Sequence, residues 1–150
     1  MIRHTILILD FGSQYTQLIA KGVRENRVFS RIIPYNTSAK EIASFYPKGL
    51  ILSGSPASVI SKNCPLPDKK IFNLGIPILG ICYGMQVVTH ILGGKVAKAK
   101  GREYGKAELF IDNNKDLFNN LSTNLTCWMS HGDEITTPPP GFVRIAHTLN

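Results

Sequence analysis

The sequence predicts an α/β fold: an open, mostly parallel sheet flanked by helices, with an antiparallel extension and a nucleophile elbow after a central strand. Up to Leu92, short apolar runs alternate with helical patterns, which is typical of a parallel sheet. After Gly93-Gly94 the periodicity becomes that of strands alone. The chain has 150 residues, of which 43% are hydrophobic and 18% charged, so it can bury the core of one globular domain.

Four strands are expected in the parallel part, at residues 5–10, 29–34, 49–53 and 76–79. The helix after the first strand is expected to bury one face, made of Tyr15, Leu18, Ile19, Gly22 and Val23. Ser38 and Glu41 form an S-x-x-E capping box, which predicts the start of a second, short helix. Another short helix is expected near 68–74, and the helix after the fourth strand should run to about Leu92.

Four further strands are expected in the antiparallel part, at residues 95–100, 106–111, 126–129 and 142–146. A turn at 112–115 and a proline-rich loop at 138–141 separate them. No linker or repeat marks a domain boundary.

Gly80-Ile81-Cys82-Tyr83-Gly84 has the spacing of a nucleophile elbow, with cysteine where many hydrolases have serine. A tight strand-to-helix turn crowds the backbone, so its flanking positions suit glycine. The start of the following helix directs N–H groups at the sulfur, which favours thiolate. From spacing alone, a small buried core cysteine is an equally good interpretation.

The position of Cys82 favours the functional interpretation. In open α/β sheets, active sites lie beyond the carboxyl ends of the strands. Three such ends carry polar turns or the cysteine: residues 10–13, 53–56 and 80–84. We expect these three segments to converge.

Composition excludes several other classes. The formal net charge is +7, but the basic residues are dispersed, which does not favour nucleic-acid binding. The nearest cluster is better explained as a solvated strand face or a docking face for another protein domain; it contains Lys95, Lys98, Lys100 and Arg102. No apolar run is long enough for a membrane span or a signal peptide, so we expect a cytoplasmic location.

The cysteines give no support for a metal site. Cys64, Cys82 and Cys127 are widely spaced and form no C-x-x-C pair, so neither zinc nor thioredoxin-type chemistry is expected. An odd number of cysteines also argues against a disulfide framework.

Five segments together resemble the class I (triad-type) glutamine amidotransferases. They are D-F-G-S-Q-Y at 10–15, S-G-S-P at 53–56, G-I-C-Y-G-M-Q at 80–86, R-E-Y-G at 102–105 and M-S-H-G-D at 129–133. The elbow alone would indicate only the superfamily. The first and the last two segments point to the GMP synthase branch.

The resemblance implies that Cys82 attacks the side-chain amide carbon of L-glutamine, forms a glutamyl thioester and releases ammonia. Backbone N–H groups of Tyr83 and Ser55 would form the oxyanion hole. The family commonly has glycine at the position of Ser55. The implied substrate-binding residues are Gly54, Gln86, Ser130, His131 and Asp133.

In the family, the general base and its orienting group are a histidine and a glutamate in an F-H-P-E-type motif after the M-S-H-G-D segment. This chain has no such motif. None of its four histidines suits the role of base; they are His4, His90, His131 and His147. Residues 1–150 are therefore expected to be an amidotransferase domain truncated at its C-terminal end, with the synthetase domain absent.

The resemblance also implies partners and cofactors. The ammonia would aminate XMP to GMP in an ATP-pyrophosphatase (synthetase) domain that uses ATP and Mg²⁺, and the full enzyme is expected to be a homodimer. This domain itself is expected to need no cofactor. Two alternatives remain: a catalytically incomplete fragment that binds glutamine or docks on the synthetase, and a different cysteine hydrolase, such as a peptidase.

Overall fold

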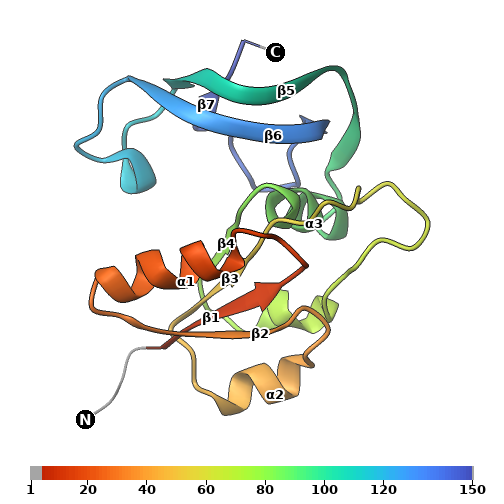
Figure 1. The fold of residues 1–150 in the computed structure, drawn as a ribbon. Helices are drawn as coiled ribbons and strands as arrows, with labels where there is room; N and C mark the ends of the chain where they lie inside the picture. Colours follow the sequence, from red (N-terminus) through yellow and green to blue (C-terminus); the bar gives the residue numbers. More distant parts are fainter. Residues whose placement is uncertain (1–4, 150) are drawn as a thin grey trace. The chain divides into compact units, whose positions relative to one another are not determined.

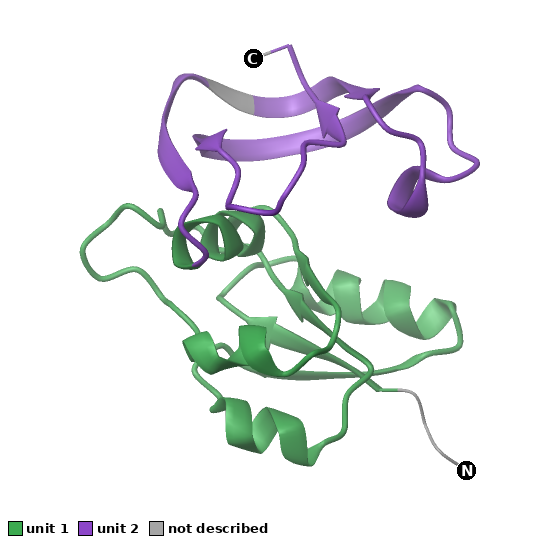
Figure 2. Cartoon of the chain, turned by 180° about the vertical axis from the view of Figure 1, so that it is seen from behind, with its two compact units in different colours: residues 1–91 green, residues 92–150 purple. Residues whose placement is uncertain are grey.

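The computed structural model describes residues 5–149, except for the side chains of residues 102 and 103. The chain divides into two compact units, residues 1–91 and residues 92–150 (Figure 2). The division falls where the sequence pattern changes from alternating strands and helices to strands alone.

The first unit contains a four-stranded parallel sheet in the order β2-β1-β3-β4 (Figure 1). Its strands are β1 (Thr5–Asp10), β2 (Phe29–Pro34), β3 (Gly49–Leu52) and β4 (Ile78–Gly80). Its helices are α1 (Thr16–Glu25), α2 (Ala39–Ser44) and α3 (Tyr83–Ile91), with a 3₁₀ helix, η1, at Lys69–Asn73. Helices α1 and α2 lie on opposite faces of the sheet. The predicted fold class is confirmed.

The core of this unit lies along the two central strands. Leu7, Ile8 and Leu9 of β1 are fully buried, and every residue of β3 is buried. Strands that are covered on both faces need such continuous apolar runs, because neither face is left to solvent. The carboxyl ends of β1 and β3 are thereby held rigidly beside each other.

The buried face of α1 agrees with the prediction only in part. Ile19 and Val23 pack against the core as expected. Tyr15 and Leu18 are 53% and 60% exposed, whereas Thr16 and Ala20 are buried. Ala20 packs with Ile8 in the core, because its small side chain lets the helix lie close to the sheet. The predicted start of α2 is confirmed: the Ser38 hydroxyl accepts a hydrogen bond from the Glu41 N–H at 3.2 Å.

The second unit contains a three-stranded antiparallel sheet in the order β6-β5-β7. Its strands are β5 (Lys95–Ile111), β6 (Asn124–Thr137) and β7 (Ala146–His147), and a 3₁₀ helix, η2, covers Asp116–Phe118. The predicted strand bounds were wrong here. The strands expected at 95–100 and 106–111 are one strand, and the strand expected at 126–129 extends over 124–137. The last strand, 146–147, shares only residue 146 with the expected 142–146.

The continuity of β5 has a structural cause. Its register against β6 shifts between Lys98, which pairs with Asp133, and Glu103, which pairs with His131. Such an irregularity absorbs extra residues without ending the strand. The R-E-Y-G segment therefore lies inside a strand. The gap between the two expected strands, residues 101–105, coincides in part with the irregularity and is not a break.

Candidate active site

Cys82 occupies the predicted sharp turn between β4 and α3. Its φ is +51°, in the left-handed region that residues other than glycine rarely adopt. The N–H groups of Met85 and Gln86 donate to the Cys82 carbonyl at 3.0 and 3.2 Å, so the helix begins immediately after the cysteine. A nucleophile on a strained strand–turn–helix is the geometry of the elbow.

The two glycines of the motif are required by close packing. A Cβ on Gly80 would lie 2.6 Å from the Met85 nitrogen and 2.7 Å from its Cα. A Cβ on Gly84 would collide with the Leu52 carbonyl oxygen. The G-x-C-x-G spacing thus reflects the approach of α3 to its own turn and to β3, as the sequence predicted.

The side chain of Cys82 is accessible to solvent. Cys82 is exposed, so its interpretation as a buried core cysteine was wrong. Partial loss of surrounding water raises the pKa of the thiol above its ordinary value. Stabilisation of the thiolate by the start of α3 stays a prediction. A reaction at Cys82 needs a general base.

The turns after β1 and β3 lie beside the cysteine, which confirms the predicted convergence. A Cβ built on Gly54 would be 3.7 Å from the Cys82 Cβ and 3.5 Å from the Ser13 hydroxyl oxygen. In addition, the Ile81 N–H donates to the Leu52 carbonyl at 3.0 Å, which ties the elbow to the end of β3. Gly54 therefore lies within contact distance of both the cysteine and the turn after β1.

Ser55 has an ordinary backbone conformation. Among the described residues, five other than glycine have positive φ, and Ser55 is not one of them. Its hydroxyl accepts a hydrogen bond from the Ala57 N–H at 3.1 Å, which stabilises the turn. Serine at this position is therefore accommodated without a positive φ, and its backbone N–H is retained.

Tyr83 and Gln86 are both buried on α3. Tyr83 is 2% exposed and its hydroxyl donates to the Pro65 carbonyl at 2.7 Å. Gln86 is 6% exposed and lies one helical turn beyond Cys82. A buried glutamine one helical turn from an exposed thiol is a candidate for binding a polar substrate group.

The remaining predicted site residues belong to the second unit. Ser130, His131 and Asp133 lie on β6, beyond the end expected for that strand at residue 129. Asp133 is buried and Ser130 is exposed. Because successive side chains of a strand alternate between its faces, His131 and Asp133 share one face and Ser130 lies on the other.

No histidine is positioned as the base of Cys82 in the described part of the first unit. His90 is exposed in the last turn of α3, eight residues and about 12 Å along the helix from Cys82. His4 lies outside the described residues. In the second unit, His147 Nδ1 is 2.9 Å from Asp112 Oδ1, which also lies in that unit.

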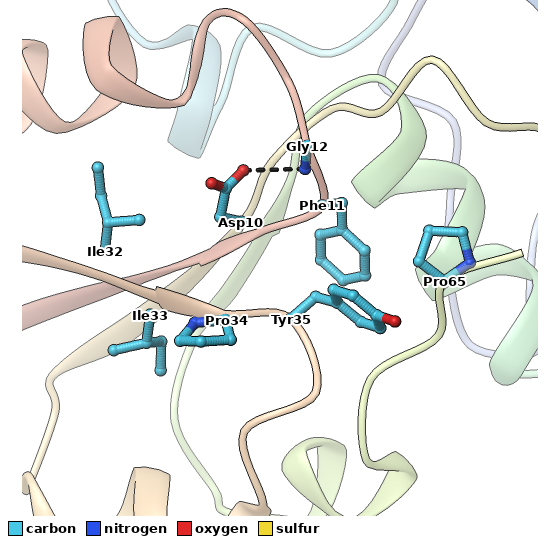
Figure 3. Close-up of a pocket in the computed structure, with 8 residues that line it drawn as sticks. All are labelled: Asp10, Phe11, Gly12, Ile32, Ile33, Pro34, Tyr35 and Pro65. Atoms are coloured by element: carbon cyan, nitrogen blue, oxygen red, sulfur yellow. Dashed lines mark hydrogen bonds between the residues drawn. The ribbon is translucent and has the colours of Figure 1, made fainter.

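A pocket of about 550 Å³ lies at the carboxyl ends of β1 and β2 (Figure 3). Phe11, Tyr35 and Pro65 line it, and so does Asp10, whose carboxylate accepts a hydrogen bond from the Gly12 N–H at 2.9 Å. Sequence reasoning missed Phe11, although its place in the D-F-G-S-Q-Y segment was the signal available. It also missed Ser53, whose hydroxyl joins the turns after β1 and β3 through the Phe11 N–H at 3.0 Å.

Other site types find no support in the described residues. Within 5–149, no three His, Cys, Asp or Glu side chains are grouped so as to hold a metal ion. In the same range, no helix has the length and apolar character needed to cross a bilayer. On β5, Lys95, Lys98 and Lys100 are exposed, as expected for a solvated strand face.

Comparison with known proteins defines the class. The family model for class I glutamine amidotransferases matches residues 7–150, so the chain belongs to this family. Its fold agrees with a crystal structure of a glutamine amidotransferase from Thermotoga maritima, with a TM-score of 0.73 at 19% identity, covering 97% of this chain and 67% of the other.

Similarity is greater to one branch of the family. The chain is 56% identical over 148 residues to a glutamine-hydrolysing GMP synthase from Caldanaerobacter subterraneus, and 55% identical over 148 residues to one from Trichormus variabilis. Both matches cover 99% of this chain, which spans only 29% and 27% of those relatives. A crystal structure of a proposed GMP synthase subunit from Thermoplasma acidophilum has a TM-score of 0.83 at 28% identity, covering 99% of this chain and 75% of the other.

Proposed function

We propose that this chain is the glutamine-hydrolysing part of a GMP synthase, in which Cys82 is the nucleophile. The observation that carries the proposal is the conformation of Cys82: exposed, at φ +51°, between two glycines that tolerate no Cβ. A structural cysteine has no need of that strain, whereas a nucleophile does, because the turn lifts its sulfur away from the sheet.

In the proposed reaction, the Cys82 sulfur bonds to the side-chain amide carbon of L-glutamine. Negative charge develops on the amide oxygen, where the N–H groups of Tyr83 and Ser55 would stabilise it. The C–N bond then breaks and the nitrogen leaves as ammonia, having gained the proton from the thiol. Water hydrolyses the remaining thioester to glutamate.

The other site residues are proposed to bind the amino-acid end of the substrate. Gln86 would face it from α3, and the space beside Gly54 would admit the side-chain amide. By similarity to the family, Ser130, His131 and Asp133 would contact the α-amino and α-carboxylate groups.

The general base and its orienting group are proposed to lie outside residues 1–150. The raised pKa of the Cys82 thiol supports this proposal, because desolvation of the thiol disfavours its charged form and a general base would remove its proton. A synthetase part, also outside this chain, would use ATP and Mg²⁺ to aminate XMP with the ammonia, in a homodimeric enzyme. The cytoplasmic location stays a prediction.

A second candidate is a part that binds glutamine, or docks on the synthetase, without turning it over. The raised pKa of the thiol and the lack of a suitably placed histidine in the described part of the first unit favour it. The intact elbow argues against it, because a chain that had lost its chemistry would have no use for the strain at Cys82.

GMP formation by the chain together with its synthetase part tests the proposal, with either glutamine or ammonium chloride as nitrogen source. Cys82→Ala should abolish the glutamine-dependent reaction and leave the ammonia-dependent one unchanged. The matched control is Cys127→Ala, which changes a cysteine of the second unit and should support both the glutamine-dependent and the ammonia-dependent reaction. Glutamine-dependent synthesis by Cys82→Ala would remove Cys82 from the mechanism.

A further inference from the structure

Phe11, at the end of β1, contacts both segments that carry the proposed oxyanion donors. It is 4% exposed. Its backbone N–H donates to the Ser53 hydroxyl oxygen at 3.0 Å, and its ring centroid lies 5.6 Å from that of Tyr83. One residue thus connects the turn that contains Ser55 with the residue after the nucleophile.

The contact to Ser53 fixes the start of the 53–55 turn. The Ser53 hydroxyl accepts from Phe11 and donates to the Gly54 carbonyl at 3.1 Å, and the side chain is fully buried. Its backbone N–H donates to the Leu9 carbonyl at 3.1 Å. These hydrogen bonds join Ser53 to β1 and to the residue after it, and so fix the backbone from which Gly54 and Ser55 continue.

The contact to Tyr83 restrains the other donor. The Tyr83 ring is held at its far end by the hydroxyl bond to Pro65, and burial raises the pKa of the phenol, which keeps that donor protonated. On its other side the Phe11 ring stacks on Tyr35, with centroids 5.4 Å apart (Figure 3). A side chain fixed at the ring and at the hydroxyl leaves its backbone little freedom to rotate.

We infer that Phe11 is a positioning residue that holds the two oxyanion donors in fixed relation to each other. This inference rests on the proposed function. Oxyanion donors act only within a narrow range of distance, and a shift of about 1 Å costs about a hundredfold in rate. Ser55 and Tyr83 come from segments far apart in the sequence, so their relative position depends on contacts between those segments. Phe11 contacts the first segment through its backbone N–H and the second through its ring.

The test compares a ligand that uses the oxyanion hole with one that does not. The γ-aldehyde analogue of glutamine forms a hemithioacetal: its carbonyl carbon bonds to the Cys82 sulfur, and the thiol proton ends on the former carbonyl oxygen. The donors bind that oxygen, and the equilibrium needs no catalytic base. Glutamine itself binds before the charge develops, so its affinity reports the rest of the site.

Three variants would be compared with the unaltered chain. Phe11→Leu should weaken the aldehyde adduct about tenfold, a fraction of the effect of losing one donor, while glutamine binds within about twofold. Tyr83→Phe, which removes only the bond to Pro65, should weaken the adduct about threefold. Phe29→Leu changes an exposed phenylalanine of β2 and should leave both affinities unchanged.

Alkylation of Cys82 by iodoacetamide provides a further readout and should proceed at equal rates in all variants, because the thiol itself is unaltered. Equal aldehyde affinity in Phe11→Leu and the unaltered chain would overturn the inference. So would an equal loss of aldehyde and glutamine affinity, which indicates a general packing role. If Phe11→Leu does not fold, Ser53→Ala, which removes the acceptor of the Phe11 N–H, decides, and an unchanged adduct overturns the inference. Failure of the unaltered chain to bind either ligand would instead refute the proposed function.

Discussion

Gly84→Ala should destabilise the chain strongly, because the elbow has no room for a methyl group at this position. The new Cβ would overlap the Leu52 carbonyl oxygen and lie 2.7 Å from its carbonyl carbon and 2.8 Å from its Cβ. Leu52 is fully buried at the end of β3, which pairs with β1 on one side and β4 on the other. The clash is with backbone, so a change of rotamer cannot relieve it.

The magnitude follows from the cost of overpacking. Extra methyl groups in a packed core cost about 1–3 kcal/mol, and a clash with paired backbone belongs at the upper end of that range. With a urea dependence of about 1–3 kcal/mol per molar, a loss of about 3 kcal/mol lowers the midpoint by about 1–3 M.

The assay is urea unfolding followed by circular dichroism, with Gly22→Ala as the matched control. Gly22 lies inside α1, and a Cβ there would meet nothing within 4 Å. That variant should gain about 0.5–1 kcal/mol, because alanine restricts the unfolded chain and favours helix. The two glycine-to-alanine changes should therefore shift the midpoint in opposite directions. A Gly84→Ala midpoint at or above that of the unaltered chain would refute the close approach of α3 to β3.

Three further outcomes are expected. Gly54→Ala should fold normally, since its Cβ would make only ordinary contacts at 3.5 Å or more, but the methyl group faces Cys82 and should slow labelling by a glutamine analogue; an unchanged rate would remove Gly54 from the substrate site. Ser55→Gly should leave labelling within about twofold, because the N–H remains; a much larger loss would show that the hydroxyl matters. The hydrogen bond from His147 lowers the pKa of Asp112 below its ordinary value of 3.8. The contacts of the ionised Asp112 carboxylate therefore stabilise the fold above that pH, and this stabilisation is lost as the pH falls through the lowered value. Asp112→Asn should accordingly lower the melting temperature at neutral pH and have no effect in strong acid, and a difference that persisted in acid would contradict the pairing.

Sequence alone predicted the parallel half of the fold well, because its signals are local. Strands β1 and β2 were predicted with their observed ends, and Ser38 marked the start of α2 through a side-chain bond that spans three residues. The elbow was predictable from its G-x-C-x-G spacing, although only the requirement at Gly80 arises within the turn and that at Gly84 comes from the approach of α3 to β3.

The parts that sequence reasoning missed depend on contacts between distant residues. The face of α1 was assigned only in part, because Ala20, small and only weakly apolar, is selected by the closeness of the sheet, whereas exposed Leu18 has the stronger sequence signal. The single strand β5 is continuous only because β6 pairs along both of its halves. The bridge through Phe11 joins residues 42 positions apart, and no local pattern reports it.

Covalent labelling of Cys82 tests the central claim most directly. The chain would be incubated with a diazo-ketone analogue of glutamine, its intact mass measured, and the adduct mapped to a peptide. The proposed function predicts a single adduct on Cys82 that excess glutamine prevents, with Cys64 and Cys127 unmodified. An adduct on another cysteine, or one that glutamine does not prevent, would contradict the assignment of Cys82 as the nucleophile of a glutamine site.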